Sequence, residues 1–451
     1  MDLTVLNKVA SFENLEKAMR NCTKTVGWKP SVINFTLHAF PRLCELQKEL
    51  FSGKYKISDY IKFTILEPKE RKVVSTRFRD RVIQKSISDN YFYPMVTKSF
   101  IYDNGACLKD RGCEYIRDRM CAGLQKYFRI SKTNKGCVLK IDIHDYFGST
   151  SHDLVKETLA RSVKDEWTYQ FLCKIIDSFD QGPDPNIGMA LGSQITQITQ
   201  LAVLDKVDHF IKEVLRIKFY YRCMDDFILY HSDKKYLLEC RDRIIEKLAE
   251  MGFAVSEKKT QIYKIDEGFK ALGFKFRLTP TGKVIKTVDP KTIKRSKRIV
   301  RKQLYLVAAG YMTLDKLKQN QEGIISYFTS RVSKNKANKP FLYRSTNYWQ
   351  IHRYKEWLMR IIKKSEDTIN AEIQIRALKG EIFQLKAYVD KLLVRQQCDC
   401  PYITNDAFER INKYIESGCW NFYDVEAAYK AHWLDDKQFS TFERFLRPAD
   451  Y

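Results

Sequence analysis

Hydrophobic and polar positions in the middle of the chain follow the two periods that strands and helices require. Segment 136–147 (GCVLKIDIHDYF) is rich in β-forming residues and ends in a polar turn, which predicts a strand. Segment 219–232 (FYYRCMDDFILYHS) has two apolar halves around a polar Met-Asp-Asp tip and predicts a hairpin. Segment 234–252 has apolar residues at helical spacing and a terminal glycine, so we expect a capped helix. Two further strands are expected in 254–265 and 270–279, and this order of elements predicts an α+β fold.

Both ends of the chain have helical patterns. Residues 1–21 contain no long apolar stretch and predict an amphipathic helix rather than a signal peptide. Beyond residue 367 an apolar seam repeats at spacings of three and four, through Ile375, Leu378, Ile382, Leu385, Val389 and Leu392. A seam this short either joins two copies of the chain or packs on the chain itself. The irregular charges beside it favour packing within the chain.

Charge changes this picture. The 451 residues carry 79 Lys and Arg against 55 Asp and Glu, a net charge of +24. Segment 281–302 has a net charge of +8 and segment 331–364 a net charge of +9, the latter interleaved with aromatic residues. Such a mixture suits phosphate contacts and base stacking, which favours a nucleic-acid partner over an acidic protein or a small cation. The alternative is a pair of solvated helices whose aromatic side chains face a core. The candidate nucleic-acid contacts are Lys294, Arg295, Lys297, Arg298, Tyr348 and Trp349.

Cysteine usage and hydropathy indicate the compartment. The 12 cysteines include no Cys-x-x-Cys pair and no cluster with zinc spacing. Unpatterned thiols of this kind indicate a reducing compartment, where most act as small core residues. No run approaches the 18 apolar residues or so that a membrane span needs. We therefore expect a cytoplasmic protein without a membrane partner.

Three carboxylates stand at the ends of apolar strands. Asp142 ends the strand expected in 136–147, and Asp225 and Asp226 form the tip of the expected hairpin. Carboxylates with apolar neighbours are unfavourable unless a cation neutralises them. Two strands that deliver them to one point would build an oxygen-lined site for Mg²⁺, and paired metals of this kind carry out nucleotidyl transfer. The alternative for the Asp-Asp pair alone is an exposed turn.

Further segments accompany these carboxylates, and in this order they resemble motifs of the reverse transcriptases over roughly residues 60–365. Arg222-Cys-Met-Asp-Asp226 is similar to the family's Tyr-x-Asp-Asp hairpin, with Cys223 in place of the usual Tyr. The preceding strand with Asp142 matches the family's first metal-binding motif. The remaining three segments resemble a fingers segment, a palm segment that ends in Lys-Thr and a primer-grip turn; they are 69–87, 252–260 and 272–274.

The resemblance implies roles for individual residues. Asp142, Asp225 and Asp226 would be catalytic and would hold two Mg²⁺ ions, with Asp226 assisting. Phe147 would lie under the sugar of the incoming nucleotide as a gate against the 2′-hydroxyl, or would be an ordinary core residue. The nucleotide's phosphates would be contacted by Lys69, Arg71 and Lys259, each of which is otherwise a solvated surface cation.

Segment 188–197 departs from the intron and retroviral pattern. Leu191 stands where those enzymes carry a Gln, and Gln197 stands where they carry a Pro. Leucine has no hydrogen-bonding group, so contacts to the nucleotide and template must differ there. With Gly192 between them, the segment is similar to that of diversity-generating retroelement enzymes and of some bacterial defence-associated reverse transcriptases. Leu191, Gly192 and Gln197 are accordingly candidates for nucleotide binding.

The resemblance implies a right-hand polymerase fold, α+β overall, with fingers, palm and helical thumb and an α-helical C-terminal extension. The expected division is an N-terminal helical extension of the fingers, then fingers with palm, a basic helical thumb and a helical C-terminal extension, over 1–60, 61–278, 279–366 and 367–451. The C-terminal extension could also join copies of the chain into a homo-oligomer.

The expected activity is RNA-directed DNA polymerisation. The substrates would be dNTPs and a dedicated structured non-coding RNA template, the product a nascent cDNA, and the cofactor Mg²⁺. The helices beyond the thumb favour a role in bacterial antiphage defence over a mutagenic diversity-generating retroelement. A non-catalytic RNA-binding scaffold is the alternative from another class. The three intact carboxylates argue against it, because a scaffold has no use for them opposite a polyanion.

Overall fold

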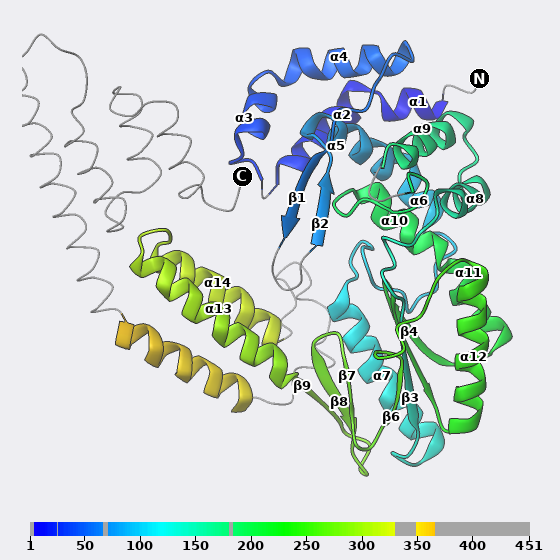
Figure 1. The fold of residues 1–451 in the computed structure, drawn as a ribbon, viewed down its shortest axis with the longest axis vertical. Coiled ribbons are helices and arrows are strands. Elements are labelled where there is room, and N and C mark those ends of the chain that lie inside the picture. Colours follow the sequence, from blue (N-terminus) through cyan, green and yellow to red (C-terminus); the bar gives the residue numbers. More distant parts are fainter. Residues whose placement is uncertain (1–3, 25, 66–70, 180–183, 330–348, 366–451) are drawn as a thin grey trace, which may run out of the picture. The chain divides into compact units, whose positions relative to one another are not determined.

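The computed structural model describes residues 4–24, 26–65, 71–179, 184–329 and 349–365 (Figure 1). The α-helices are α1 Thr4–Val9, α2 Phe12–Thr23, α3 Pro30–Leu37, α4 Ala39–Phe51, α5 Phe78–Ile87, α6 Tyr93–Val96, α7 Cys113–Ser131, α8 His152–Ser162, α9 Glu166–Asp177, α10 Gln194–Val203, α11 Asp205–His209, α12 Lys234–Glu250, α13 Pro290–Ala308 and α14 Leu314–Thr329. Two π-helical turns, Ser88–Phe92 and Phe210–Val214, follow α5 and α11, and a further helix covers 349–365. The strands are β1 Ile61–Ile65, β2 Arg71–Ser75, β3 Cys137–Asp142, β4 Phe219–Cys223, β5 Asp226–His231, β6 Gln261–Lys264, β7 Phe269–Ala271, β8 Phe274–Leu278 and β9 Val284–Val288.

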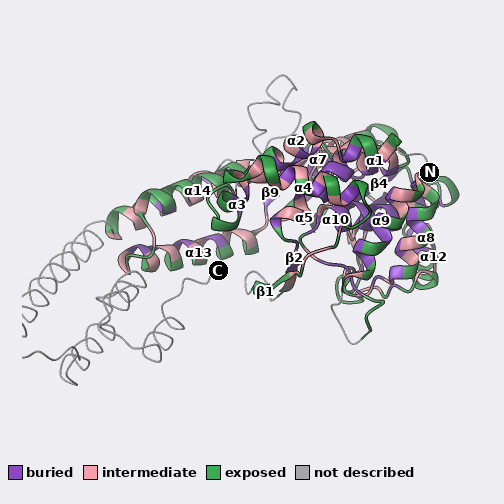
Figure 2. Ribbon diagram, turned by 90° about the horizontal axis from the view of Figure 1, so that it is seen from above, coloured by how far each residue is buried: buried purple, intermediate pink, exposed green. Residues whose placement is uncertain are grey.

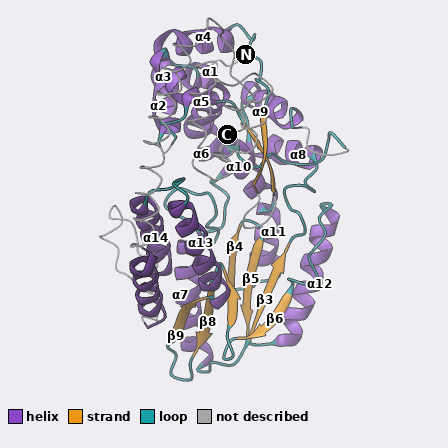
Figure 3. Ribbon diagram, turned by 60° about the vertical axis from the view of Figure 1, so that its left-hand side comes forward, coloured by secondary structure: helices purple, strands orange, loops and turns teal. Residues whose placement is uncertain are grey.

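A four-stranded sheet in the order β4-β5-β3-β6 forms the centre of the first part of the chain (Figure 3). Its two inner strands, β3 and β5, pair antiparallel along their whole length. Both read as continuous apolar runs because both faces are covered: Leu139, Ile141, Ile228 and Leu229 are fully buried. Helix α7 contacts β4, and α12 contacts β3 and β5. The sheet is therefore held as one rigid layer.

The strand and hairpin expected in 136–147 and 219–232 are confirmed as β3 and as β4 with β5. Helix α12 confirms the helix expected in 234–252, and Gly252 has a left-handed φ of 82° just beyond it. The α+β character is confirmed as well. What the alternation could not predict is where each strand stops, since a strand ends when its partner does.

Three expectations were wrong in detail. Segment 254–265 contains only the short strand β6, because residues 256–260 turn back on themselves through hydrogen bonds to Ser256. Segment 270–279 is a hairpin of β7 and β8, because Leu272 and Gly273 adopt left-handed φ values of 48° and 80°. The helix expected in 1–21 is two helices, since Ser11 caps a new helix by accepting a hydrogen bond from the Asn14 backbone.

The chain divides into two compact units, one running to residue 287 and the other beginning at residue 288. In the second unit α13 packs on α14, and Tyr354 of helix 349–365 donates a hydrogen bond to Gln321 of α14 at 2.9 Å. Figure 2 shows that α13 and α14 carry mainly exposed and half-buried residues, with a single buried stripe facing their neighbours. The basic residues of α13 lie outside that stripe.

Two expectations lie outside the described residues: the seam at 375–392 and the helical extension over 367–451. The division at 278 and 366 remains a prediction. Of the helices that the structure does describe, none has the length and apolar character of a membrane span.

Candidate active site

The register of the central sheet brings the three carboxylates to one end. Asp142, the last residue of β3, is the direct partner of Asp226, the first residue of β5. Asp226 also pairs with Cys223 across the β4–β5 hairpin. Asp225 sits in the intervening two-residue turn beside Met224, whose left-handed φ is 59°. Asp142 and Asp226, 84 positions apart in sequence, are thus neighbours because antiparallel pairing fixes which residues face each other.

The negative charge at this point is only partly balanced. Burial raises the pKa of Asp225 to about 6, and the neighbouring Asp226 and Asp142 carboxylates contribute to that rise. Burial and Asp142 likewise raise the pKa of Asp226, against the opposing effect of Lys140. The Lys140 ammonium lies 3.9 Å from Asp226, too far for a hydrogen bond. A carboxylate cluster that resists ionisation in this way favours a cation.

The residues present fit a hard divalent cation. Asp142 and Asp226 are 15% and 32% exposed, so their oxygens are accessible from one side. Carboxylate oxygens are the donors that Mg²⁺ prefers. Asp142 Oδ1 accepts a hydrogen bond from Lys259 Nζ at 2.7 Å, so an ammonium meets one of the candidate ligands. Among the described residues, no three His, Cys, Asp or Glu side chains are gathered closely enough to hold an ion as they stand.

A buried ion pair, which the sequence analysis did not predict, stabilises the β4–β5 hairpin. Arg222 of β4 and Asp208 of α11 are both fully buried, and the guanidinium donates to both carboxylate oxygens of Asp208 at 2.7–2.9 Å. Arg222 Nη1 also donates to the carbonyl oxygen of Met224 at 3.1 Å, and Tyr220 donates to Asp208 at 2.5 Å. The turn that carries Asp225 is therefore tied to the helical layer. An Arg inside the apolar run FYYRC was the available signal, because a buried guanidinium requires a partner.

Phe147 and segment 188–197 come together through the backbone. The Phe147 carbonyl oxygen accepts a hydrogen bond from the Met189 backbone at 2.8 Å, and the Thr150 carbonyl oxygen accepts one from Gly188 at 2.9 Å. Phe147 is half-buried, with its ring centroid 5.7 Å from that of the fully buried Tyr146. A half-buried ring beside a buried one is compatible with both interpretations of Phe147, the gate and the core residue. The structure places this residue next to the unusual segment.

Gly192 lies against β2. Its left-handed φ of 118° favours glycine, and the Val74 carbonyl oxygen, 3.3 Å from where a Cβ would lie, leaves little room for a side chain. Ser193 follows and donates a hydrogen bond to Gln84 of α5 at 3.0 Å, in a fully buried position. Leu191 and Gln197 on either side are half-buried. Segment 188–197 is therefore hydrogen-bonded to α5 through Ser193, while the side chains of Leu191 and Gln197 remain partly exposed to solvent.

The expected phosphate contacts are dispersed. Arg71 is exposed at the start of β2, and Lys69 lies outside the described residues. Lys259 is 66% exposed and pairs with Asp142, which raises its pKa. Of the two that the structure describes, Lys259 contacts a carboxylate of the site, Asp142.

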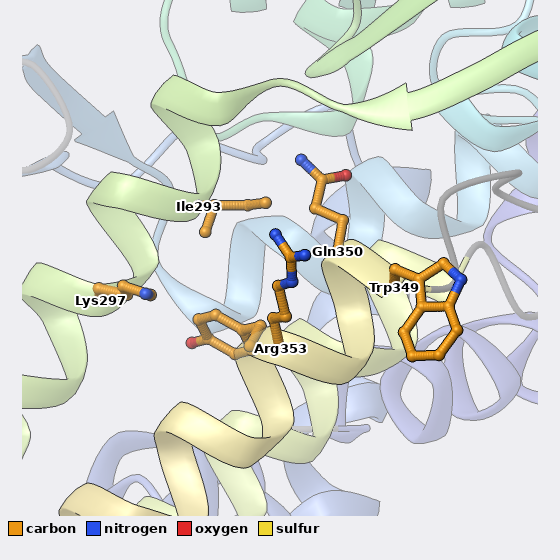
Figure 4. A pocket seen from close by; sticks show the side chains of 6 residues that line it. Ile293, Lys297, Trp349, Gln350 and Arg353 are labelled. Carbon is orange, nitrogen blue, oxygen red and sulfur yellow. The ribbon is translucent and has the colours of Figure 1, made fainter.

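The basic residues of the second unit form a separate candidate surface. Lys294, Arg295 and Arg298 are basic residues of α13, outside its buried stripe. Lys297 lies in a pocket of about 440 Å³ whose far side is formed by helix 349–365 (Figure 4). Trp349, which is 69% exposed, stands at the start of that helix, and the Lys297 ammonium lies 4.7 Å above the Trp357 ring. Tyr348 lies outside the described residues.

Gln350 anchors this pocket. Its side chain accepts a hydrogen bond from the Val288 backbone at 3.2 Å and donates one to the Val288 carbonyl at 2.9 Å. Helix α13 and helix 349–365, which are separate in sequence, therefore line one pocket within the second unit, which the charge pattern had not predicted.

Comparison with known proteins gives one family match, which lies within the first unit. Residues 66–276 match the family described as reverse transcriptase (RNA-dependent DNA polymerase). No curated protein matches the sequence. Solved structures that match include an apo telomerase from Candida tropicalis truncated of its C-terminal domain, at 14% identity and a TM-score of 0.40, and an apo telomerase from the same organism, at 13% identity and a TM-score of 0.40.

The first match covers 52% of this chain and 55% of the telomerase chain, so this chain spans about half the length of that structure. The second covers 70% and 64%. At TM-scores of 0.40 neither structural similarity supports a conclusion about this chain. The family match spans all three carboxylates, the hairpin and segment 188–197, and with it the expected right-hand polymerase fold is confirmed. Residues 66–276 of this chain are therefore similar to a reverse transcriptase domain.

Proposed function

We propose that this chain synthesises cDNA by two-metal nucleotidyl transfer at Asp142, Asp225 and Asp226. The observation that carries the proposal is the pairing of Asp142 with Asp226, which joins both acidic motifs at one end of the sheet. The raised pKa of Asp225, to about 6, supports it, because the site resists its own charge until a cation is bound. Bound Mg²⁺ ions would activate the primer 3′-hydroxyl and neutralise the departing pyrophosphate.

The chain's own residues would position the reactants. Asp142 and Asp225 would hold the ions, while Asp226, fixed between two strands, would orient Asp142. Lys259 would leave Asp142 once metal is bound, and its ammonium would then face the nucleotide's phosphates. The distance of 2.7 Å between the two groups supports this exchange, since one carboxylate oxygen serves either cation.

Phe147, Leu191, Gly192 and Gln197 would form the nucleotide's surroundings. The hydrogen bond from Met189 to Phe147 supports this grouping, because it couples the ring's backbone to the unusual segment. An aromatic ring under the sugar excludes a 2′-hydroxyl by shape alone. A leucine beside the nascent pair contributes packing without a hydrogen bond. Arg71, and Lys69 before it, would contact phosphates from the β1–β2 hairpin.

We propose further that the template is a dedicated structured non-coding RNA, held by the second unit. The cations on α13 and the Lys297–Trp349 pocket support this proposal, because phosphates and an unpaired base need these two kinds of group. The biological role would be antiphage defence. Its support is the helical pattern of the sequence beyond residue 367, because segment 188–197 resembles both the defence-associated and the diversity-generating enzymes.

Isosteric removal of the charges tests the catalytic proposal. Asp225→Asn with Asp226→Asn should reduce dNTP incorporation by more than about 10³-fold, since metal ions supply several kcal/mol of transition-state stabilisation. The matched control is Asp242→Asn, which alters a 63% exposed carboxylate on α12. Filter binding should show unchanged RNA affinity in both variants. Incorporation by the double variant at the rate of the control would overturn the proposal.

The same preparations address template and role. Sequencing of the RNA and cDNA that co-purify with the active protein should give one RNA species and its complement. A broad RNA population would argue against a dedicated template. Cells with the active protein should survive phage challenge better than cells with the double variant, and equal survival would remove the defence role. RNA binding without incorporation on any primer–template would establish the scaffold instead.

A further inference from the structure

Two thiols from distant parts of the first unit meet beside the catalytic hairpin. Cys113 and Cys223 are 110 positions apart, and their sulfur atoms are 3.3 Å from each other. Cys113 opens α7 and is exposed, whereas Cys223 ends β4 and is buried. One thiol is therefore accessible to a small reagent, and the second lies within contact distance of it.

Cys223 is also part of the scaffold that carries the carboxylates. It pairs directly with Asp226 across the hairpin, and Met224 and Asp225 follow it in the turn. Arg222, the residue before it, is locked by Asp208 and by the Met224 carbonyl oxygen. Because Arg222 is held in place, a displacement of Cys223 would move the turn residues Met224 and Asp225.

We propose that Cys113 and Cys223 form a reversible disulfide in response to a hydroperoxide, and that this bond switches the polymerase off. The bond itself is independent of the catalytic assignment, whereas its effect on synthesis rests on the proposed function. A tyrosine at position 223, as in the Tyr-x-Asp-Asp hairpin, could not form this bond. The pair exists because cysteine stands at that position and a second cysteine begins α7.

The chemistry balances with hydrogen peroxide as the oxidant. The Cys113 sulfur attacks one peroxide oxygen, the O–O bond breaks, and a sulfenic acid and one water result. The Cys223 sulfur then attacks the Cys113 sulfur, the S–O bond breaks, and a second water leaves as the disulfide forms. The two thiols lose two electrons and two protons in total, and the peroxide takes them up. A dithiol reductant reverses the reaction by thiol–disulfide exchange.

The geometric consequence is specific. A disulfide has a sulfur–sulfur distance of about 2.05 Å, so closing the present separation of 3.3 Å draws Cys223 and α7 together. Asp226 follows Cys223 through the strand pairing. Because a misplacement of about 1 Å at a reacting centre can cost 10²-fold in rate, we expect the oxidised protein to lose about that factor of activity.

The test uses the full chain with hydrogen peroxide as the probe. After titration with peroxide and blocking of free thiols, peptide mass mapping should show a cross-link between the peptides that contain Cys113 and Cys223. dNTP incorporation should fall by about 10²-fold in parallel, and dithiothreitol should restore both. Cys113→Ser should keep the activity of the reduced protein and resist peroxide. Cys107→Ser is the matched control, because Cys107 is also exposed but should not be needed for the bond.

Each outcome has a meaning. A Cys107–Cys113 cross-link, or no cross-link at any peroxide concentration that leaves the protein folded by circular dichroism, overturns the proposal. A cross-link without loss of incorporation keeps the disulfide and overturns the switch. If the reduced protein shows no incorporation at all, the proposed function fails, while the cross-link still reports on the pair. Loss of activity in Cys113→Ser under peroxide equal to wild type also overturns the switch.

Discussion

The central sheet of the first unit and helix α13 of the second unit handle charge in opposite ways. Beside the sheet, Arg222 and Asp208 are fully buried and bind each other, and the nearby carboxylates of Asp225 and Asp226 have raised pKa values. On α13, Lys294 and Arg295 lie outside the buried stripe and reach solvent. A buried pair fixes a position because breaking it is costly. Cations in contact with solvent attract a polyanion without fixing any one geometry.

The difference fits the two roles proposed for these regions. Chemistry requires atoms held to within a fraction of an ångström, and the hairpin obtains this from a guanidinium that bonds to the turn's own carbonyl oxygen. Holding a long nucleic acid requires many weak contacts that tolerate sequence, which suits cations on a helix surface. Substitutions on one side of this comparison should therefore leave the other side unaffected.

The largest effect is expected from the buried pair. Asp208→Leu leaves the Arg222 guanidinium buried without a carboxylate to balance its charge, so the free energy of unfolding should fall by about 3–5 kcal/mol. The matched control is Glu157→Gln, which breaks the exposed pair with Lys206 and should cost no more than about 1 kcal/mol. Urea unfolding measures both.

A double variant separates stability from positioning. Asp208→Leu with Arg222→Met should recover most of the lost stability, because apolar groups replace both charges. Polymerase activity should stay low, because the Met224 carbonyl oxygen has lost its donor. If activity returned together with stability, the pair would be only structural.

The next effect concerns the cations of α13. Reversal of Lys294, Arg295 and Arg298 to Glu should weaken RNA binding by about 10²-fold and reduce the salt dependence by roughly 0.9 for each phosphate that is no longer neutralised. Titrations of RNA at several salt concentrations measure both quantities. The same reversal at Lys234 and Lys235, exposed on α12, serves as the control. An unaltered salt slope in the α13 variant would show that these residues form only a solvated helix surface.

A smaller effect follows from the pKa of Asp225, which is about 6 in the folded protein. This value lies above the usual range for Asp in an unfolded chain, so the folded state binds the proton more tightly. In the absence of divalent cations the stability of wild type should therefore fall as pH rises from about 4 through 6. Asp225→Asn removes this carboxylate and should be more stable by about 2 kcal/mol at neutral pH.

Thermal unfolding across this pH range, with a chelator and then with Mg²⁺, makes the measurement. Mg²⁺ should stabilise wild type above pH 6 and lose that effect as the carboxylate takes up its proton. Parallel pH profiles for wild type and variant would contradict the electrostatic account of the site.

The smallest effect is expected at Phe147. Phe147→Val should raise ribonucleotide relative to deoxyribonucleotide incorporation by about 10-fold, because a shape contact of this size is worth roughly 1–3 kcal/mol. Phe171→Val, which removes a buried ring from α9, controls for lost packing. An unchanged ratio in Phe147→Val, with a stability loss like that of the control, would make Phe147 a core residue.

Local pattern was sufficient for the elements that carry the chemistry. The apolar runs around Asp142 and around the Met-Asp-Asp tip predicted β3 and the β4–β5 hairpin, since alternation and turn residues are properties of neighbouring positions. The ordered motifs in turn indicated a reverse transcriptase over roughly residues 60–365, and the family match covers residues 66–276 of that stretch. The excess of basic residues predicted a nucleic-acid partner, which depends on net charge rather than on fold.

Contacts between distant segments were decided only by the tertiary structure. The pairing of Asp142 with Asp226 depends on a strand register that local sequence does not encode. Two further contacts depend on how helices α11 and α7 lie against β4: the ion pair between Arg222 and Asp208, and the contact between the sulfur atoms of Cys113 and Cys223. Hydrophobic periodicity tells which face of an element is buried, but not which partner it will meet. What a buried polar group does depends on the group that it contacts, and that contact is formed only when the chain folds.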